Sequence, residues 1–397
     1  MTACRLCGST KVQIAFSFPN HSIVHHLKDS PHESGDFSGP FNLHQCMTCG
    51  FLFSKDYFAP KNYLYDNYLT LSSAKPQPHA HRLIEMLRML SLKSNPSIFE
   101  IGCNDGSFIK LLAQNKFSEV AGIEPAKDAF SEAYQVSRNI INDFFSSKLS
   151  SDIAKTGQYD VVVTRQVLEH ISELHDFLEG VKKILQHDGI LVIEVPDQTM
   201  NFMQADYSFW EEHINYFTIN TLSQLLRCHG FYIFHSETIM FSGQALTVYC
   251  KNINKSKSFE FYDYDHALRE KYINQFSSFK SELKDYLTAQ RDRYKEIYIY
   301  GAGCRSLCLV DFIDIGNLIS GFIDDAGDKS NKFSVGSSLP ILEFDEKHME
   351  NSFFLLGVNS EIEARLIASR MLPADRLHSI LPPSRRLPDF WQKYCIW

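Results

Sequence analysis

The chain has 397 residues, enough for two or three domains of ordinary size. Its 44% hydrophobic and 22% charged residues are typical of a globular protein and argue against a disordered or fibrous chain. The formal net charge of −8, with no dense run of Lys and Arg, argues against a nucleic-acid substrate, because binding to phosphates needs concentrated positive charge.

The sequence also argues against a membrane protein. Its apolar runs are far shorter than the roughly 20 residues that a transmembrane helix needs. Residues 1–5 lack the basic start of a signal peptide, and no apolar core follows them. We therefore expect a cytoplasmic protein with reduced cysteines, in which closely spaced cysteine pairs indicate a metal site rather than disulfide bonds.

Two C-x-x-C pairs stand in the N-terminal part of the chain. Cys4 and Cys7 form the first pair, Cys46 and Cys49 form the second, and a glycine follows each pair. Two such turns point four thiolates at one ion and complete a tetrahedral site, which predicts a structural zinc ion within a domain of residues 1–73. The alternatives are four unrelated thiols, or a site that includes a nearby histidine.

A strand, a glycine-rich turn and a helix follow each other from residue 97 onward. The apolar strand at residues 97–101 comes after a helical pattern at residues 80–90, and the next helix begins near Phe108. The turn between them is neither a phosphate loop nor a complete G-x-G-x-x-G. Its pattern, E-I-G-x-N-x-G, resembles the first motif of class I methyltransferases, which bind S-adenosylmethionine (SAM). The implied SAM-binding residues are Glu100, Gly102, Asn104 and Gly106.

Three later strand ends add candidate SAM contacts. The strand at residues 120–124 ends in Glu124, where a carboxylate can accept hydrogen bonds from both ribose hydroxyls. Asp143 and Phe144 follow a short apolar run, at a place where an acid–aromatic pair contacts adenine in such folds; a helix cap beside core aromatics is the alternative. Gln166 follows the strand at residues 159–163.

Further strands complete a recognisable sheet. A fifth strand at residues 189–196 is followed by a helix at residues 221–227 and by a β-hairpin at residues 231–251. Parallel βαβ units closed by an antiparallel hairpin predict the seven-stranded doubly wound α/β sheet of class I SAM methyltransferases, over residues 74–254. Ligands of such sheets bind at the carboxyl ends of the strands.

The C-terminal part predicts a smaller Rossmann-like domain over residues 255–397. A long helix at residues 264–295 precedes a strand that runs into Gly301-Ala302-Gly303, and the strand at residues 320–325 ends in two acids. Because the third glycine of a dinucleotide site is missing, NAD binding is the less favoured interpretation.

Taken together, these parts resemble the three-domain SAM-dependent sugar C-methyltransferases, which act on nucleotide-linked keto-deoxysugars. The resemblance covers nearly the whole chain. It rests on both cysteine pairs, residues 68–73, the SAM turn, the E-H-x-x-Y-F element at residues 212–217, and residues 300–303 and 357–362.

The resemblance implies roles for several residues. His213 would take a proton from the carbon next to a ketone, and the resulting enolate would attack the SAM methyl group. Glu212 would raise the basicity of His213, or would form a surface pair with it. His170 would hold the enolate oxygen or orient the sugar, and Tyr68 would close the pocket from the N-terminal domain. The implied substrate contacts are Trp210, Tyr216, Arg305 and Asn359.

Trp210, Thr70 and Arg305 depart from the residues usual in that family, which leaves the acceptor open. An O- or N-methyltransferase in which His213 deprotonates a hydroxyl is the second hypothesis. A non-catalytic zinc-containing protein with a SAM fold is the third, and the intact SAM turn with Glu124 argues against it. Structural roles for His170 and His213 also remain alternatives.

Overall fold

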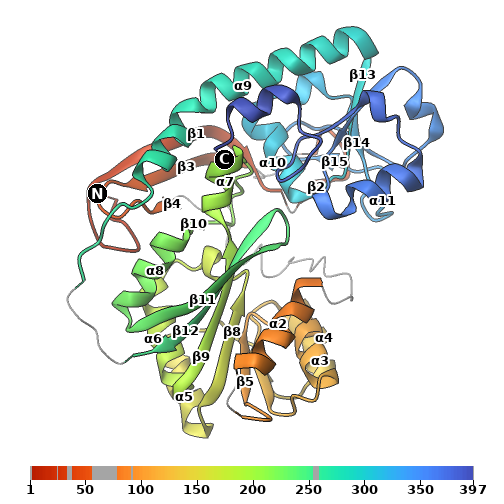
Figure 1. Ribbon diagram of the computed structural model, residues 1–397. Helices are drawn as coiled ribbons and strands as arrows, with labels where there is room; N and C mark the ends of the chain where they lie inside the picture. The colour runs from red at the N-terminus through yellow and green to blue at the C-terminus, as the bar shows by residue number, and fades with distance from the viewer. Residues whose placement is uncertain are drawn as a thin grey trace.

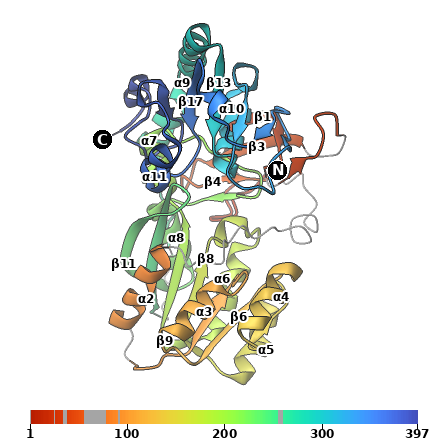
Figure 2. The ribbon, with the colours of Figure 1, turned by 90° about the vertical axis from the view of Figure 1, so that its right-hand side faces the viewer.

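The computed structural model describes residues 2–24, 26–33, 38–55, 78–90, 93–253 and 259–396. The described residues form a seven-stranded, a five-stranded, a four-stranded and a two-stranded sheet. Figures 1 and 2 place the seven-stranded sheet and its helices in a lower lobe, and the N-terminal and C-terminal sheets in an upper lobe. The predicted domain boundaries fall at or next to residues outside the described ranges and stay predictions.

The seven-stranded sheet has the order β11-β12-β9-β8-β5-β6-β7. The run from β9 to β7 is parallel, and the hairpin of β11 and β12 is antiparallel, which confirms the predicted class I SAM methyltransferase fold. The strands are β5 (Ile98–Ile101), β6 (Val120–Ile123), β7 (Ile140–Ile141), β8 (Tyr159–Arg165), β9 (Leu185–Pro196), β11 (Phe231–Met240) and β12 (Gln244–Asn252).

Helices cover both faces of this sheet, because its central strands are apolar on both sides. In β8, Val161 and Val163 pack into the core that includes α2 and α3, and Val162 packs into the core of the opposite face with α6. These helices are α2 (Pro78–Leu90), α3 (Ser107–Gln114), α4 (Lys127–Val136), α5 (Ser147–Thr156), α6 (Leu174–Ile184) and α8 (Ile219–Cys228), whereas α7 (Gln198–Gln204) packs into the core of the upper lobe through Phe202.

The N-terminal sheet borrows a strand from the segment of the E-H-x-x-Y-F element. Its own strands are β1 (Val12–Ser22), β3 (Ser38–Cys46) and β4 (Leu52–Ser54), and β10 (Asn215–Tyr216) pairs antiparallel with β4. In addition, Nη1 of Arg5, which lies between the first two cysteines, donates to the carbonyl oxygen of Ile214 at 3.0 Å. The cysteine-bearing region therefore contacts the chain directly beside His213, through this hydrogen bond and the pairing of β4 with β10.

The C-terminal sheet is parallel throughout, in the order β16-β14-β13-β17-β18. Its strands are β13 (Glu296–Tyr300), β14 (Gly321–Ile323), β16 (Ile341–Leu342), β17 (Ser352–Leu356) and β18 (Leu377–Ser379), with helices α10 (Cys304–Ile313) and α11 (Ser360–Arg370). A small antiparallel pair, β2 (Leu27–Lys28) with β15 (Phe333–Ser334), connects this region to the N-terminal one.

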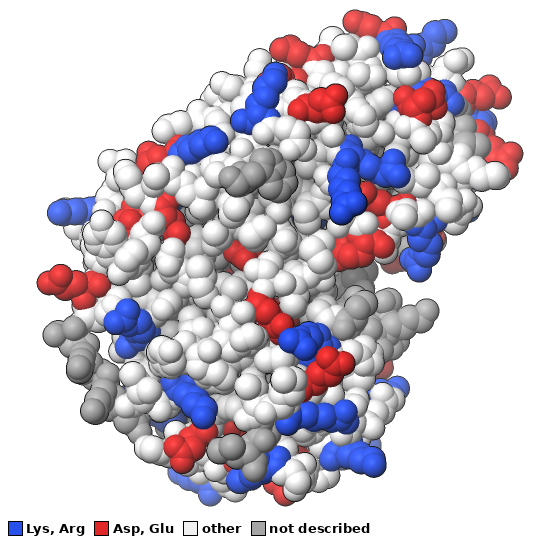
Figure 3. Space-filling view, in the orientation of Figure 1, with Lys and Arg blue, Asp and Glu red and all other residues white. Residues whose placement is uncertain are grey.

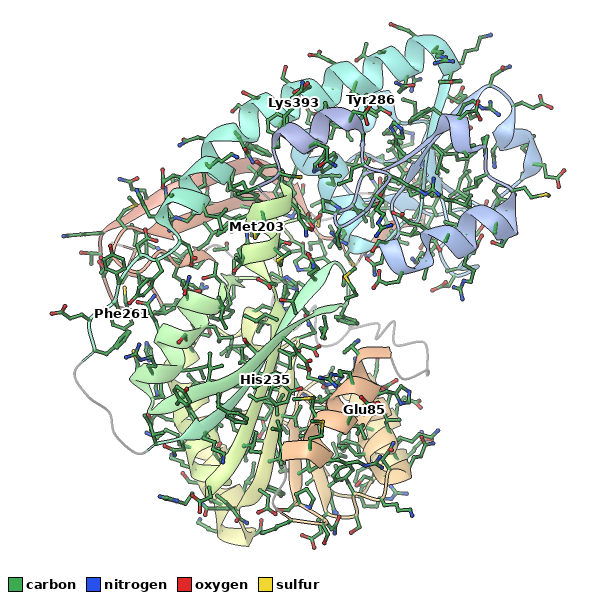
Figure 4. The ribbon with its side chains drawn as sticks, in the orientation of Figure 1. Glu85, Met203, His235, Phe261, Tyr286 and Lys393 are labelled. Carbon is green, nitrogen blue, oxygen red and sulfur yellow. The ribbon has the colours of Figure 1, made fainter. Side chains whose placement is uncertain are left out.

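The long helix α9 (His266–Tyr294) runs along the top of the upper lobe in Figure 1 and ties its parts together. The hydroxyl of Tyr272 donates to the carbonyl oxygen of Asp206 at 2.5 Å. The C-terminal segment returns to α7, where the backbone N–H of Ile396 donates to the carbonyl oxygen of Met203 at 2.7 Å; Figure 4 labels Met203 on that helix. No helix among the described residues is long and apolar enough to span a bilayer.

Candidate functional site

A cavity of about 640 Å³ opens at the carboxyl ends of β5, β6, β8 and β9, where a doubly wound sheet is expected to bind its ligand. Residues from α7 to β10 and from the C-terminal region also line it. The predicted site residues that line it are Glu100, Gly102, Asn104, Glu124, Asp143, Phe144, Gln166, His170, Trp210, Glu212, His213, Tyr216, Arg305 and Asn359. Tyr68 lies outside the described residues.

The first glycine turn (residues 102–106) is held to the tip of β6 by backbone and carboxylate contacts. The N–H of Gly102 donates to the carbonyl oxygen of Ile123 at 2.9 Å. The two carboxylate oxygens of Glu124 accept from the backbone N–H groups of Asn104, at 2.9 Å, and Ala126, at 2.8 Å. Burial raises the pKa of Glu124 above its usual value, and these two donors partly offset that effect.

Gly102 is needed for two reasons. Its φ of +73° lies in the left-handed region, and a Cβ there would stand 2.4 Å from Cγ2 of Val167. Gly106 differs from Gly102, because it is not among the lining residues. It has φ +76°, and a Cβ would stand 3.0 Å from the Cα of Ala133, so this glycine lets α3 approach α4.

Glu100 lies beneath the turn and is almost completely buried. Its Oε1 accepts from Nη2 of Arg165 at 3.0 Å, and the guanidinium carbon of Arg165 also stands 4.1 Å from the centroid of the Phe108 ring. Burial raises the pKa of Glu100 to about 6, although Arg165 works against this rise. The contact between Glu100 and Arg165 therefore holds a buried carboxyl group against the cavity, below the first glycine turn.

The other predicted SAM contacts present polar atoms or a ring face. Asp143 is exposed and its Oδ1 accepts from the N–H of Phe144 at 2.7 Å, while the Phe144 side chain at the cavity is 52% exposed. Such a ring can stack on a flat heterocycle without leaving a core. Gln166 has φ +53° and its Nε2 donates to Oε1 of the buried Glu194 at 3.3 Å.

Two histidines of the cavity lining lie next to each other. The ring centroids of His170 and His213 are 4.9 Å apart, and those of Trp210 and His213 are 4.3 Å apart, both in edge-to-face geometry. Nδ1 of His170 lies 3.0 Å from the backbone carbonyl oxygen of Glu212. A proton on Nδ1 satisfies this carbonyl and leaves the lone pair on Nε2. Glu212 is only 4% exposed, so the surface-pair interpretation of this residue is wrong.

Sequence reasoning missed Glu169, the neighbour of His170. It lines the cavity, is 0% exposed, and neither of its carboxylate oxygens has a hydrogen-bond partner among the described residues. Burial raises its pKa to about 8, and the charge of Glu194 adds to the rise. The Leu-Glu-His pattern after a strand contained the signal, but the pattern alone does not say that the acid faces inward.

A second cavity of about 480 Å³ adjoins the first at the carboxyl ends of β13 and β17. It contains the second glycine turn (residues 301–303), and Trp210, Arg305 and Asn359 line both cavities. The buried Arg305 donates from Nη2 to Oδ2 of Asp206 at 2.5 Å and from Nη1 to Oδ1 of Asn359 at 3.3 Å. Arg305 therefore holds the wall between the cavities, whatever it contacts in a bound substrate.

The four predicted zinc ligands come together at the N-terminal end of the N-terminal sheet. The Sγ atoms of Cys4 and Cys49 are 3.7 Å apart, and those of Cys7 and Cys46 are 3.5 Å apart. All four sulfurs lie within 4.8 Å of one another. Tetrahedral zinc with Zn–S bonds of about 2.3 Å separates its sulfurs by roughly 3.8 Å, so the donor set fits zinc.

Known protein families match the two α/β regions. Residues 77–236 match a model described as a methyltransferase domain, and residues 255–363 match one described as a C-methyltransferase C-terminal domain. The C-methyltransferase NovU of Streptomyces niveus is 25% identical over 253 residues, which cover 62% of this chain and 60% of that protein. A ubiquinone biosynthesis O-methyltransferase of Glaesserella parasuis serovar 5 (strain SH0165) is 28% identical over 109 residues, which cover 26% of this chain and 46% of that protein.

Among solved structures, a SAM-dependent methyltransferase from Anabaena variabilis ATCC 29413 matches with a TM-score of 0.38 and 17% identity, covering 47% of this chain and 92% of that one. The strand order and the matched family model define residues 77–236 as part of a class I SAM-dependent methyltransferase domain. The region after it is similar to the C-terminal domain of C-methyltransferases.

Proposed function

We propose that the chain is a SAM-dependent C-methyltransferase whose acceptor is a nucleotide-linked keto-deoxysugar. The observation that carries the proposal is the facing pair of His170 and His213 in the same cavity as the first glycine turn. A base and a SAM site that share one cavity suit methyl transfer to a carbon that must first lose a proton. The match to a C-methyltransferase C-terminal domain supports the choice of carbon.

In this proposal SAM lies along the carboxyl ends of β5, β6 and β7. Gly102 lets the methionine part approach the backbone, and Glu124 accepts from the ribose hydroxyls with the lone pairs that its two backbone contacts leave. The exposed ring of Phe144 suits the adenine face, and Asp143 suits its amino group. SAM supplies the electrophilic methyl group.

His213 takes the proton from the carbon next to the ketone. Trp210 packs edge-on against its ring and fixes the direction in which the nitrogen points. His170, oriented by the carbonyl oxygen of Glu212, holds the enolate oxygen. Tyr216, buried with its hydroxyl 3.3 Å from the carbonyl oxygen of Trp210, keeps this segment in register.

The second cavity takes the nucleotide part of the substrate. It adjoins the histidines through Trp210 and is lined by the cationic side chains of Arg305, Lys329 and Arg365. Two carboxylates also line it, and both are paired: Asp324 with Lys329 and Asp325 with Arg370. Cations at the end of a parallel sheet suit a diphosphate. The substrate is therefore a small molecule that reaches through both cavities. On the face drawn in Figure 3, acidic and basic side chains are interspersed, which fits a small anionic ligand better than a nucleic acid.

The zinc ion has a structural role in this proposal. The four thiolates close its coordination, and the reducing cytoplasm suits them. Through Arg5 the cysteine region holds the carbonyl oxygen of Ile214, next to His213. We expect Cys4→Ser to lower the zinc content, the melting temperature and turnover, but not SAM affinity. Full zinc content in that variant, measured by elemental analysis, would contradict the ligand set.

Deuterium exchange tests the proposed chemistry. The protein is incubated in D₂O with a nucleotide-linked keto-deoxysugar and a SAM analogue that cannot donate methyl. Deuterium should enter the carbon next to the ketone. His213→Asn should abolish exchange and lower turnover about 10²–10⁴-fold, with unchanged SAM affinity. His235→Asn, on β11 (Figure 4) and not among the cavity residues, is the matched control. A methyl group found on oxygen, without exchange, would instead identify an O-methyltransferase.

A further inference from the structure

Three potential metal ligands of the cavity stand together apart from the cysteine site. The ligand atoms of Glu169, His170 and His213 all lie within 4.8 Å of one another. Two imidazoles and one carboxylate are a common donor set for divalent first-row transition ions. Ligands at about 2.1 Å from one octahedral ion lie roughly 3 Å apart, so side-chain rotations that close less than roughly 2 Å would complete the site.

Glu169 supplies an independent indication that something is bound there. A side chain that is 0% exposed should have its polar atoms paired, yet both carboxylate oxygens lack a partner among the described residues. In the same cavity, Oε1 of Glu194 accepts from Gln166, and Oε1 of Glu100 accepts from Arg165, so each of these carboxylates has at least one donor. A carboxylate oxygen of Glu169 lies within 4.8 Å of a ring nitrogen of each histidine.

The orientation of His170 also fits a ligand. Its Nδ1 stands 3.0 Å from the carbonyl oxygen of Glu212, which is the second-sphere contact that metal-binding histidines usually make. The contact keeps the proton on Nδ1 and leaves the lone pair of Nε2 available to bind an ion. The ligand-bearing loop after β8 is itself fixed, because Nδ2 of Asn215 donates to the carbonyl oxygens of Leu168, at 3.0 Å, and Ile171, at 2.7 Å.

We propose that Glu169, His170 and His213 form a divalent-cation site, and that its ion binds the oxygen of the methyl acceptor. The role at the acceptor rests on the proposed function, whereas the binding site does not. The ion stabilises the enolate by direct charge. With the ion bound, the lone pair of the coordinating His213 nitrogen is used, so His213 is a ligand rather than the base, and the carbon-bound proton passes to a hydroxide on the ion. That hydroxide leaves as water, and the enolate oxygen stays on the ion.

Manganese binding tests the site without any substrate. The 397-residue protein, with zinc already at its four cysteines, is titrated with Mn²⁺, and free Mn²⁺ is followed by its electron paramagnetic resonance signal. One Mn²⁺ per chain should bind beyond the zinc. Glu169→Gln, which keeps the volume and removes the charge, should weaken binding by about tenfold or more, and His170→Asn should do the same.

The matched control is Glu194→Gln, which removes a buried carboxylate of the same cavity that already has partners. Its Mn²⁺ affinity should stay within about twofold of the unaltered protein, in line with a carboxylate that is not a ligand. Melting temperature and SAM affinity, measured for each variant, identify a folding defect. A lack of saturable Mn²⁺ binding, or equal affinity in Glu169→Gln, overturns the site.

Turnover then separates this inference from the proposed function. With the keto sugar as acceptor, Mn²⁺ should raise turnover at least about tenfold, and Glu169→Gln should abolish the gain. If Mn²⁺ binds but the chain methylates oxygen or nitrogen, the proposed C-methylation fails and the ion site stands. If carbon methylation proceeds equally with and without Mn²⁺, the role at the acceptor oxygen fails and His213 remains the base.

Discussion

The two glycine turns have nearly the same local geometry but different charges. In the first, Gly102 donates to the carbonyl oxygen of Ile123 and Glu124 accepts from two backbone N–H groups. In the second, Gly301 donates to the carbonyl oxygen of Ile323 at 2.7 Å, and Asp324 accepts from Ala302 at 2.8 Å and Ala326 at 3.0 Å. A parallel strand, a left-handed glycine and an acid at the next strand tip thus recur in one chain.

The difference lies in what neutralises the acid. Nζ of Lys329 stands 3.1 Å from Oδ2 of Asp324 and 3.1 Å from the carbonyl oxygen of Ala302, whereas no cation pairs with Glu124 among the described residues. A bare carboxylate suits hydroxyl donors, and a neutralised one beside further cations suits an anion. The same backbone pattern can therefore serve a nucleoside in one domain and a phosphate in the other.

The largest expected effect on SAM affinity comes from adding a side chain at Gly102. Gly102→Val adds strain of roughly 1–3 kcal/mol from its φ and overpacking of roughly 1–3 kcal/mol against Val167. The turn must shift, so SAM affinity should fall on the order of a hundredfold, as isothermal titration calorimetry would measure.

Gly301→Val is the matched control for this change. Its Cβ would meet Cγ1 of Val358 at 2.5 Å, nearly the same overlap, at φ +107°. It should lower the melting temperature to a similar extent but leave SAM affinity unchanged. If both variants lose SAM affinity equally, the two turns do not have separate ligands.

The acids at the strand tips should differ in the same way, with a smaller effect. Glu124→Ala removes a charged acceptor worth about 1.5–3 kcal/mol, so SAM affinity should fall about tenfold or more. Asp324→Ala should leave SAM affinity as it is and lower KM for the nucleotide-linked sugar, because it frees the charge of Lys329 beside the proposed phosphate position. Equilibrium binding of SAM to both variants checks this, and an unchanged affinity in Glu124→Ala would place the ribose elsewhere.

The sequence was sufficient for features that depend on neighbouring residues. The unbroken apolar run Val161-Val162-Val163 is typical of a strand buried on both faces, and the glycine turn after β5 predicts the ligand end of the sheet. The spacing within each cysteine pair likewise predicts two thiolates that bind one ion, although the pairing of β1 with β3 is what brings the two pairs together. The strand and the turn follow from a few neighbouring residues, so tertiary context does not change them.

Features that depend on distant pairing were not predictable. The two-residue strand β10 pairs Asn215 with Phe53, far away in the chain, and a strand that short has no periodicity. The inward orientation of Glu169 depends on how the loop after β8 is anchored by Asn215. Gly106 looks like a cofactor glycine in the motif, but its missing side chain accommodates Ala133 of α4.

The smallest expected effect concerns the cation of the second turn. Lys329→Met keeps most of the side-chain length and removes the charge, which leaves Asp324 unneutralised beside the proposed phosphate position. Both consequences disfavour an anion, so KM for the nucleotide-linked sugar should rise about fivefold, close to 1 kcal/mol, with kcat and SAM affinity unchanged. Added salt should shrink the difference in KM, because the Lys329 side chain is 18% exposed and partly screened.

Lys332→Met, which removes a 39%-exposed lysine near Asp29, is the control and should leave KM unchanged. A lower melting temperature without any change in KM would show that Lys329 only stabilises the second glycine turn. The nucleotide would then have to bind outside the second cavity.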